Sequence, residues 1–131
     1  MNFSSVSYAV RVFKKYLFYM RSQKWNRKTV EEYQDRMLIN IVKHAAQNVP
    51  YYRNLFREIR FNPHEFRGRV DMHKIPLLDK QTIRIRQKEF IAENADEYGI
   101  NWESTSGSTG TPLHLIIDNS AKSKERNSFE V

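Results

Sequence analysis

The sequence has 131 residues, 40% of them hydrophobic and 13% aromatic, which predicts one modest folded domain rather than a disordered tail. It has no cysteine, which excludes thiolate catalysis, cysteine-based zinc sites and disulfide bonds, and no apolar run approaches the roughly 18 residues that span a bilayer. The net charge of +7 is uneven: residues 1–60 hold 12 Lys/Arg and 4 Asp/Glu, whereas residues 61–131 hold 10 and 11. We therefore expect a cytoplasmic protein whose basic half faces any anionic partner.

Residues 6–21 have the pattern of an amphipathic helix. Apolar side chains recur at three- and four-residue spacing, whereas the basic ones fall between them. Two interpretations stay open: the apolar stripe packs on the protein's own domain, or it lies on an anionic membrane at the inner face. We treat residues 1–28 as a basic amphipathic leader and residues 29–131 as the domain proper.

Nucleic acid is a weaker candidate partner for the leader. Arg21, Lys24, Arg27 and Lys28 surround Trp25, a combination that can bind phosphates and stack on bases. No recognised RNA-binding motif accompanies the cluster. Anionic membrane is therefore the preferred partner of this segment.

Helices are also predicted for the middle of the chain. Thr29 and Glu32 form a capping-box pattern for a helix that ends near Asn48, and a short helix follows in residues 51–59. The dipeptide Asn62-Pro63 predicts a further helix start.

The next segment, residues 75–90, begins extended. Asp79 is the predicted N-cap of a helix that runs to about Phe90. After Gly99 the pattern changes to two short β-leaning runs, "INWESTS" and "PLHLIID", which predict a hairpin.

The connection between the two runs is rich in hydroxyl side chains and glycine. Hydroxyl groups and backbone N–H groups supply hydrogen-bond donors, and glycine permits close approach of an anion. The spacing differs from that of a P-loop, which has four residues between its glycines and then Lys-Ser/Thr. Taken by composition alone, such a run is also typical of a flexible linker. The candidate phosphate ligands are Thr105, Ser106, Gly107, Ser108, Thr109, Gly110 and Thr111.

In its order of residues, "TSGSTGTP" resembles the phosphate-binding signature of the adenylate-forming (acyl-CoA synthetase) superfamily. The segments "NVPYYRNLF" and "IPLLDKQTIR" resemble the N-terminal region of its phenylacetate-CoA ligase-like branch, which includes capsular polysaccharide biosynthesis proteins of the CapK type. The resemblance covers about Thr29 to Asp118. It implies an α/β fold in which a helical N-terminal region precedes a β-hairpin with a phosphate-binding-type loop.

The resemblance also implies an activity. In that family a carboxylate attacks the α-phosphorus of ATP in the presence of Mg²⁺, pyrophosphate leaves, and many members pass the acyl group to coenzyme A. The loop residues named above would hold the β- and γ-phosphates. Many superfamily members carry a lysine after the loop proline, where this chain has Leu113, a difference that favours the phenylacetate-type branch.

Family members are several times longer than this chain. We therefore expect the N-terminal piece of an incomplete adenylate-forming domain, truncated, split or dependent on a partner, and inactive by itself. The resemblance places no catalytic residue and no metal ligand on this sequence. The alternative is a non-enzymatic basic module that binds anionic membrane or nucleic acid.

Overall fold

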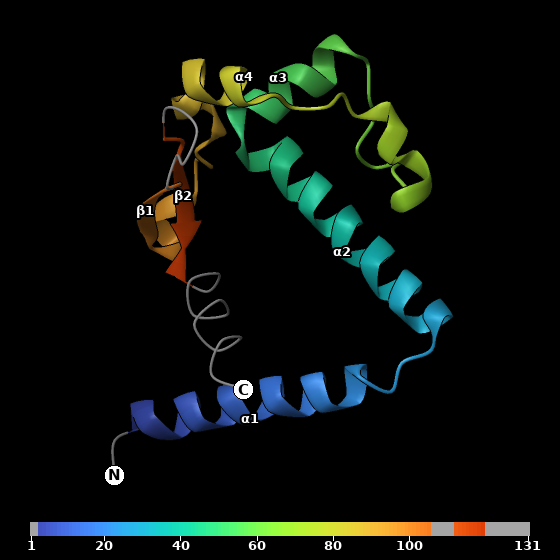
Figure 1. Ribbon diagram of the computed structural model, residues 1–131, viewed down its shortest axis with the longest axis vertical. Helices are drawn as coiled ribbons and strands as arrows, with labels where there is room; N and C mark the ends of the chain where they lie inside the picture. The colour runs from blue at the N-terminus through green and yellow to red at the C-terminus, as the bar shows by residue number, and fades with distance from the viewer. Residues whose placement is uncertain (1–2, 106–111, 120–131) are drawn as a thin grey trace.

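The computed structural model describes residues 3–105 and 112–119 of the chain (Figure 1). Its elements in chain order are α1 (Phe3–Ser22), α2 (Arg27–Asn48), α3 (Pro50–Glu58), the 3-10 helix η1 (Arg69–Lys74), α4 (Lys80–Ile85), the 3-10 helices η2 (Gln87–Phe90) and η3 (Ala95–Tyr98), and the strands β1 (Ile100–Ser104) and β2 (His114–Asp118). The described part is thus mostly helical and closes on a two-stranded antiparallel hairpin, as an α/β fragment with a helical front would. Within this part, no helix combines the length and apolarity needed to cross a membrane.

The start of α2 differs from the prediction. Asn26, not Thr29, is the N-cap, and its side-chain oxygen accepts a hydrogen bond from the Thr29 backbone N–H at 2.9 Å. Asparagine is among the preferred N-cap residues, so the helix can begin one turn earlier. Arg27 then pairs with Glu31 at 2.8 Å, one turn further along. The end at Asn48 was predicted correctly, and Pro50 occupies the first turn of α3.

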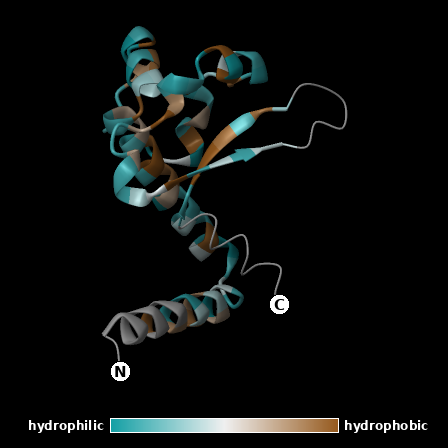
Figure 2. Cartoon of the chain, turned by 90° about the vertical axis from the view of Figure 1, so that its left-hand side faces the viewer, coloured by the Kyte–Doolittle hydropathy of each residue, from teal (hydrophilic) through white to brown (hydrophobic). Residues whose placement is uncertain are grey.

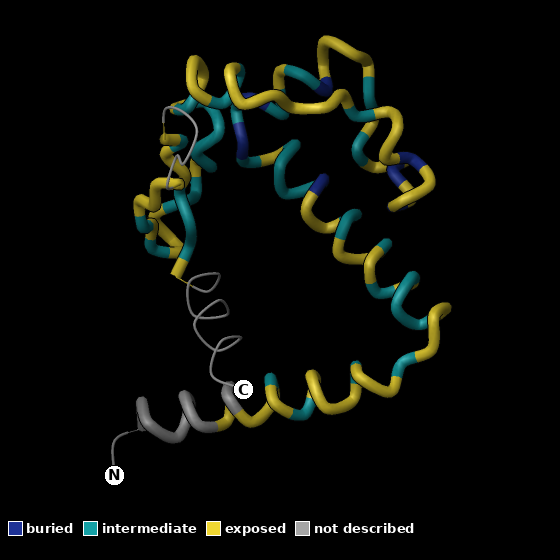
Figure 3. Tube along the Cα trace, viewed as in Figure 1, coloured by how far each residue is buried: buried dark blue, intermediate teal, exposed yellow. Residues whose placement is uncertain are grey.

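The core lies where α2 and α3 meet the segment that follows them. Val42, Phe56 and Phe66 are buried there (Figure 3). The partly buried side chains that pack against them are Leu38, Ile39, Ala46, Tyr52, Leu55, Phe61 and Ile75. Four of these ten residues are aromatic, and Phe61 contacts both Phe56 and Phe66 at centroid distances of 4.7 and 5.9 Å. Burial of such large rings contributes strongly to the stability of this part of the chain.

The predicted helix at Asn62-Pro63 is wrong. The chain makes a turn there, in which the Asn62 side chain accepts a hydrogen bond from the His64 backbone N–H at 3.0 Å. This local bond competes with helix formation, and the chain then extends to carry Phe66 into the core. Tertiary burial of one aromatic ring therefore replaces a helical turn.

Gly68 allows the chain to pass close to α2. Its φ is +95°, and a Cβ atom there would lie 2.5 Å from Asp35 Oδ1. The Arg69 backbone N–H and Nε donate hydrogen bonds to the same carboxylate oxygen at 2.8 and 3.0 Å. The Arg69 guanidinium holds the pKa of Asp35 below its usual range. A glycine is thus required where η1 is fixed against α2.

Asp79 is the N-cap of α4 as predicted, accepting a hydrogen bond from the Thr82 backbone N–H at 2.7 Å, but the helix is shorter than expected. It ends at Ile85, and a 3-10 turn carries Phe90 onto the ring of Tyr51, with ring centroids 4.1 Å apart. This stacked pair joins η2 to α3. A tertiary contact that the local sequence pattern does not encode decides where α4 ends.

Candidate functional site

The hairpin is closed at the base of the predicted phosphate loop. Its register pairs Ser104 with His114 as the last strand residues. One residue further on, the Thr105 backbone N–H donates to the Leu113 carbonyl at 3.0 Å, and the Leu113 N–H donates to Thr105 Oγ1, also at 3.0 Å. Threonine serves here because its hydroxyl can accept from the backbone while its own proton stays available to another acceptor. Residues 105 and 113 are therefore held together.

Of the predicted phosphate ligands, Thr105 lies within the described residues, at this closed base. Ser106, Gly107, Ser108, Thr109, Gly110 and Thr111 lie outside them. The chain resumes at Pro112, directly before Leu113. The role of residues 106–111 in binding phosphate stays a prediction.

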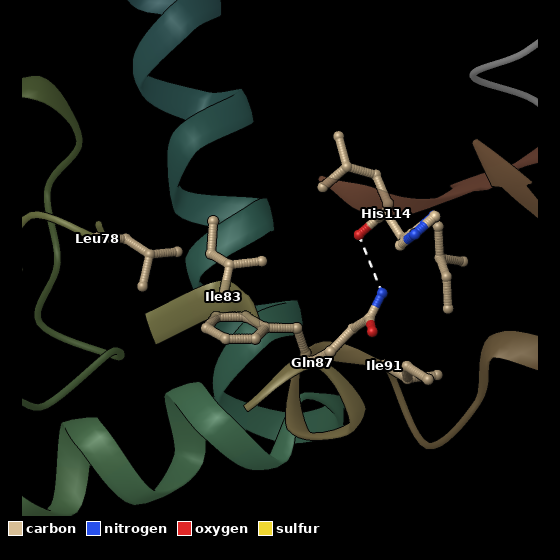
Figure 4. A pocket seen from close by; sticks show the side chains of 8 residues that line it. Leu78, Ile83, Gln87, Ile91 and His114 are labelled. Atoms are coloured by element: carbon tan, nitrogen blue, oxygen red, sulfur yellow. Dashed lines mark hydrogen bonds between the residues drawn. The ribbon is translucent and has the colours of Figure 1, made fainter. Parts of the chain in front are cut away.

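A small cavity separates β2 from the α4–η2 segment (Figure 4). It has a volume of about 170 Å³, and its lining residues are Leu78, Ile83, Gln87, Phe90, Ile91, His114, Leu115 and Ile116. Most of these side chains are apolar. The Gln87 side-chain amide donates to the His114 carbonyl at 3.0 Å, so one of the polar groups of the lining already joins the two sides. The cavity is thus part of an apolar contact region between the helices and the hairpin, and its lining does not suit a polyphosphate.

A second set of hydrogen bonds fixes the other end of the hairpin. The Asn101 side-chain amide donates to Asn119 Oδ1 at 2.7 Å, and the Asn119 backbone N–H donates to the Gly99 carbonyl at 3.1 Å. These two bonds hold the strand ends together, whereas the Gln87–His114 bond joins the hairpin to η2. The roles of Gln87 and Asn101 could not be predicted from the sequence, because long-range side-chain bonds leave no periodic signal.

Charged groups of the helical part form ion pairs with structural roles. Asp71 is the most buried of them, and it accepts hydrogen bonds from Arg67 Nε at 3.1 Å and from Lys74 Nζ at 2.7 Å. These two cations hold the pKa of Asp71 well below its usual range, and the hydrogen bond from Arg67 has the larger effect. Arg53 likewise binds Glu93 in a two-pronged pair at 2.6 and 3.0 Å, which lowers the pKa of Glu93.

The described residues contain no group of three or more His, Asp or Glu side chains that could hold a metal ion. His44, for example, is within hydrogen-bond distance of Asn48, with His44 Nδ1 3.2 Å from the Asn48 amide nitrogen, and its ring lies against that of Tyr98. The described residues of the hairpin therefore provide no such group of metal ligands.

No family model matches the chain. Two curated relatives do: it is 34% identical to a phenylacetate-coenzyme A ligase of Escherichia coli over 71 residues, 54% of this chain and 16% of the ligase. It is 29% identical to a phenylacetate-coenzyme A ligase of Thermus thermophilus over 86 residues, 66% of this chain and 19% of that ligase. The chain thus spans less than a fifth of either relative. At low identity and over partial lengths, these two similarities support the adenylate-forming ligase family for this chain.

Proposed function

We propose that this chain forms the N-terminal part of an ATP-dependent ligase that activates a carboxylate, with residues 29–131 belonging to its adenylate-forming domain. The proposal rests on one observation above all, the hairpin base that Thr105 and Leu113 close directly at a Ser/Thr/Gly loop. The similarity to two phenylacetate-coenzyme A ligases supports it. Our finer assignment is the phenylacetate-CoA ligase-like branch of the CapK type, with a role in capsule or surface polysaccharide synthesis.

In this proposal the loop holds the β- and γ-phosphates of ATP. An oxygen of the substrate carboxylate bonds to the α-phosphorus, the bond between the α-phosphorus and the bridging oxygen breaks, and pyrophosphate leaves with the electron pair. Hydroxyl and backbone N–H groups of residues 106–111 donate hydrogen bonds to the leaving group and neutralise its developing charge. Fixed donors are effective because they need no reorganisation during the reaction.

Thr105 is a positioning residue in this scheme. Its hydroxyl oxygen accepts the Leu113 N–H and its backbone N–H is bonded to the Leu113 carbonyl. Only the hydroxyl proton is left to reach a phosphate oxygen. Thr105 thus sets where the loop begins, and the glycines and hydroxyls beyond it are the proposed ligands.

Mg²⁺ and coenzyme A belong, in our proposal, to the complete ligase. The carboxylates of the described residues do not gather into a metal site, and Leu113 stands where many superfamily members have a lysine. The charge that balances the polyphosphate must then come from other parts of the enzyme. Because ATP and coenzyme A are cytoplasmic reactants, we place the reaction in the cytoplasm.

Titration calorimetry with ATP–Mg²⁺ and with inorganic pyrophosphate–Mg²⁺ tests the loop assignment. We expect weak, saturable binding of both ligands to the 131-residue chain, because they share the bound phosphates. The double change Thr109→Val and Gly110→Val should abolish it, since it removes a hydroxyl donor and places branched side chains where the anion approaches. Gln81→Val, an exposed polar-to-apolar change on α4, is the matched control and should bind as the wild type. Equal binding by the double variant, or none by the wild type, would overturn the assignment.

A pyrophosphate-release assay with phenylacetate as the probe carboxylate addresses activity. We expect no release from a polypeptide of these 131 residues, because the aligned part is 16% and 19% of the two ligases and misplacing reacting groups by about 1 Å already costs about a hundredfold in rate. Release of pyrophosphate in proportion to enzyme would contradict this expectation.

A further inference from the structure

The positive charge of the protein belongs entirely to the leader. Residues 1–28 contain seven Lys/Arg and no Asp/Glu, which leaves 15 of each for residues 29–131. The first acidic residue is Glu31. A neutral domain therefore carries a +7 segment at its N-terminal end, and most of that segment is the helix α1.

α1 presents an apolar stripe that the described residues leave uncovered. The exposed fractions are 47% for Val10, 61% for Phe13, 57% for Tyr16 and 44% for Met20. Their three- and four-residue spacings put these side chains on one side of the helix. Figures 1 and 2 both show α1 lying apart from α3, α4 and the hairpin.

The contact between α1 and α2 uses a different side of the helix. Phe18 meets Trp25 and Tyr33 with ring centroids 5.5 Å apart in both pairs. With 3.6 residues per turn, Phe18 lies about 140° around the helix from Phe13. The aromatic contact thus sets the direction of α1 relative to α2, and the apolar stripe lies on the side of α1 that faces away from α2. Of the two interpretations open from the sequence, packing of the stripe on its own domain is not what the described residues show.

We propose that α1 docks on an anionic lipid surface with this stripe in the interface. The chain combines apolar and aromatic side chains on one side with a local charge of opposite sign to the membrane, the two signals that interfacial helices use together. Lys14 and Arg21, both exposed, are seven residues apart on one face beside the stripe, within reach of lipid phosphates. Nucleic acid would explain the charge but not an exposed stripe that contains Val10 and Met20. This inference is independent of the ligase proposal.

Vesicle co-sedimentation of the full chain tests the inference. We expect binding to vesicles of phosphatidylglycerol and phosphatidylcholine, and none to phosphatidylcholine alone. Binding should be lost at an ionic strength of about 1 M, where the Debye length falls to about 3 Å. Lys14→Gln with Arg21→Gln should weaken the affinity by about thirtyfold, at about 1 kcal/mol for each basic side chain near the surface.

Removal of apolar side chains separates docking from charge attraction alone. Phe13→Ser with Met20→Ser keeps every charge and should weaken vesicle affinity about tenfold or more, because both side chains would lose their burial in lipid. Both positions are exposed, so circular dichroism should show an unchanged fold. Val70→Ser with Leu77→Ser removes two exposed apolar side chains elsewhere, and Arg57→Gln with Lys88→Gln removes two exposed charges elsewhere. Both controls should bind vesicles as the wild type does.

Four results would overturn the inference. They are equal binding to neutral vesicles, wild-type binding by either leader variant, salt-sensitive binding to single-stranded RNA without binding to anionic vesicles, and a lipid-free dimer that Phe13→Ser with Met20→Ser dissociates. The last would assign the stripe to a second copy of the chain. Loss of vesicle binding in the leader variants with normal ATP–Mg²⁺ binding would support the inference whatever the fate of the ligase proposal.

Discussion

The α2–α3 region and the hairpin use their large apolar residues in opposite ways. In the first, Phe56 is 4% exposed and lies among the rings of Tyr52 and Phe61. In the second, Trp102 is 57% exposed, and no residue of either strand is buried within the described structure. Figure 2 shows the hairpin projecting from the helices, with hydrophobic residues along its strands.

This difference teaches where the stability of the described chain lies. Apolar surface stabilises a fold only when other groups remove it from water. The aromatic side chains of α3 meet that condition, whereas the strand residues are at most half-buried and the hairpin depends more on its backbone ladder and on side-chain hydrogen bonds such as Gln87 to His114. We therefore expect the helical region to determine global unfolding and the hairpin to contribute little to it.

The largest expected effect is on the core ring. Phe56→Ala should lower the free energy of unfolding by about 3–5 kcal/mol, because it removes a buried aromatic side chain and leaves a cavity. That is a large part of the stability of a small domain. Urea denaturation followed by circular dichroism measures it, with the exposed Ile85→Ala as control. An unchanged urea midpoint for Phe56→Ala would contradict the view that the α2–α3 region determines global unfolding.

The next effect is the pH dependence that Asp71 brings to the same region. Asp71 is 1% exposed, and Arg67 and Lys74 keep its pKa in the folded state below the unfolded value of about 3.9. Its contribution to stability is then complete above that value and is lost as the pH falls through and below it. Asp71→Asn should therefore lower the stability of the fold at pH 7. Below about pH 4 the variant and the wild type should become more similar in stability.

Thermal unfolding of wild type and Asp71→Asn between neutral and acid pH makes this measurement. Asp96→Asn, a change at an exposed position, is the control, and its unfolding temperature should follow that of the wild type at every pH. If the unfolding temperatures of Asp71→Asn and the wild type differ by the same amount down to the lowest pH, the ion pairs with Arg67 and Lys74 do not cause the destabilisation.

The smallest expected effect on the free energy of unfolding is that of a substitution in the hairpin. Trp102→Ala removes a larger ring than Phe56→Ala, yet it should change the free energy of unfolding by only about 0.5 kcal/mol, because the ring is mostly in water in the described structure. The same denaturation experiment compares the two variants directly. A loss as large as that of Phe56→Ala would mean that the hairpin is part of the cooperative core.

Local patterns predicted the helices and strands well where a residue type has its own structural effect. Asp79 was identified as a cap because a carboxylate can accept backbone N–H groups, and Pro50 marked the boundary of two helices because it lacks a donor. The two β-leaning runs predicted the hairpin, and Thr105 lies at its closed end. Binding of phosphate by residues 105–111 stays a prediction.

Other features depend on residues far apart in the chain. The missing helix after Asn62 and the short α4 result from Phe66 and Phe90 being drawn to the core and to Tyr51, contacts that no local period encodes. The direction of the stripe on α1 is a similar case. The sequence determined that a stripe exists, whereas the contact of Phe18 with Trp25 and Tyr33 decided that it faces away from α2.

The sequence by itself determined the four α-helices and the two strands in their order, the concentration of positive charge in residues 1–28, and the hydroxyl-rich connection between the strands. Caps, periodicity and composition are local properties, so they can be read along the chain. Only the tertiary structure decided which apolar side chains are buried and where helices stop, because burial depends on partners that the fold brings together from distant positions.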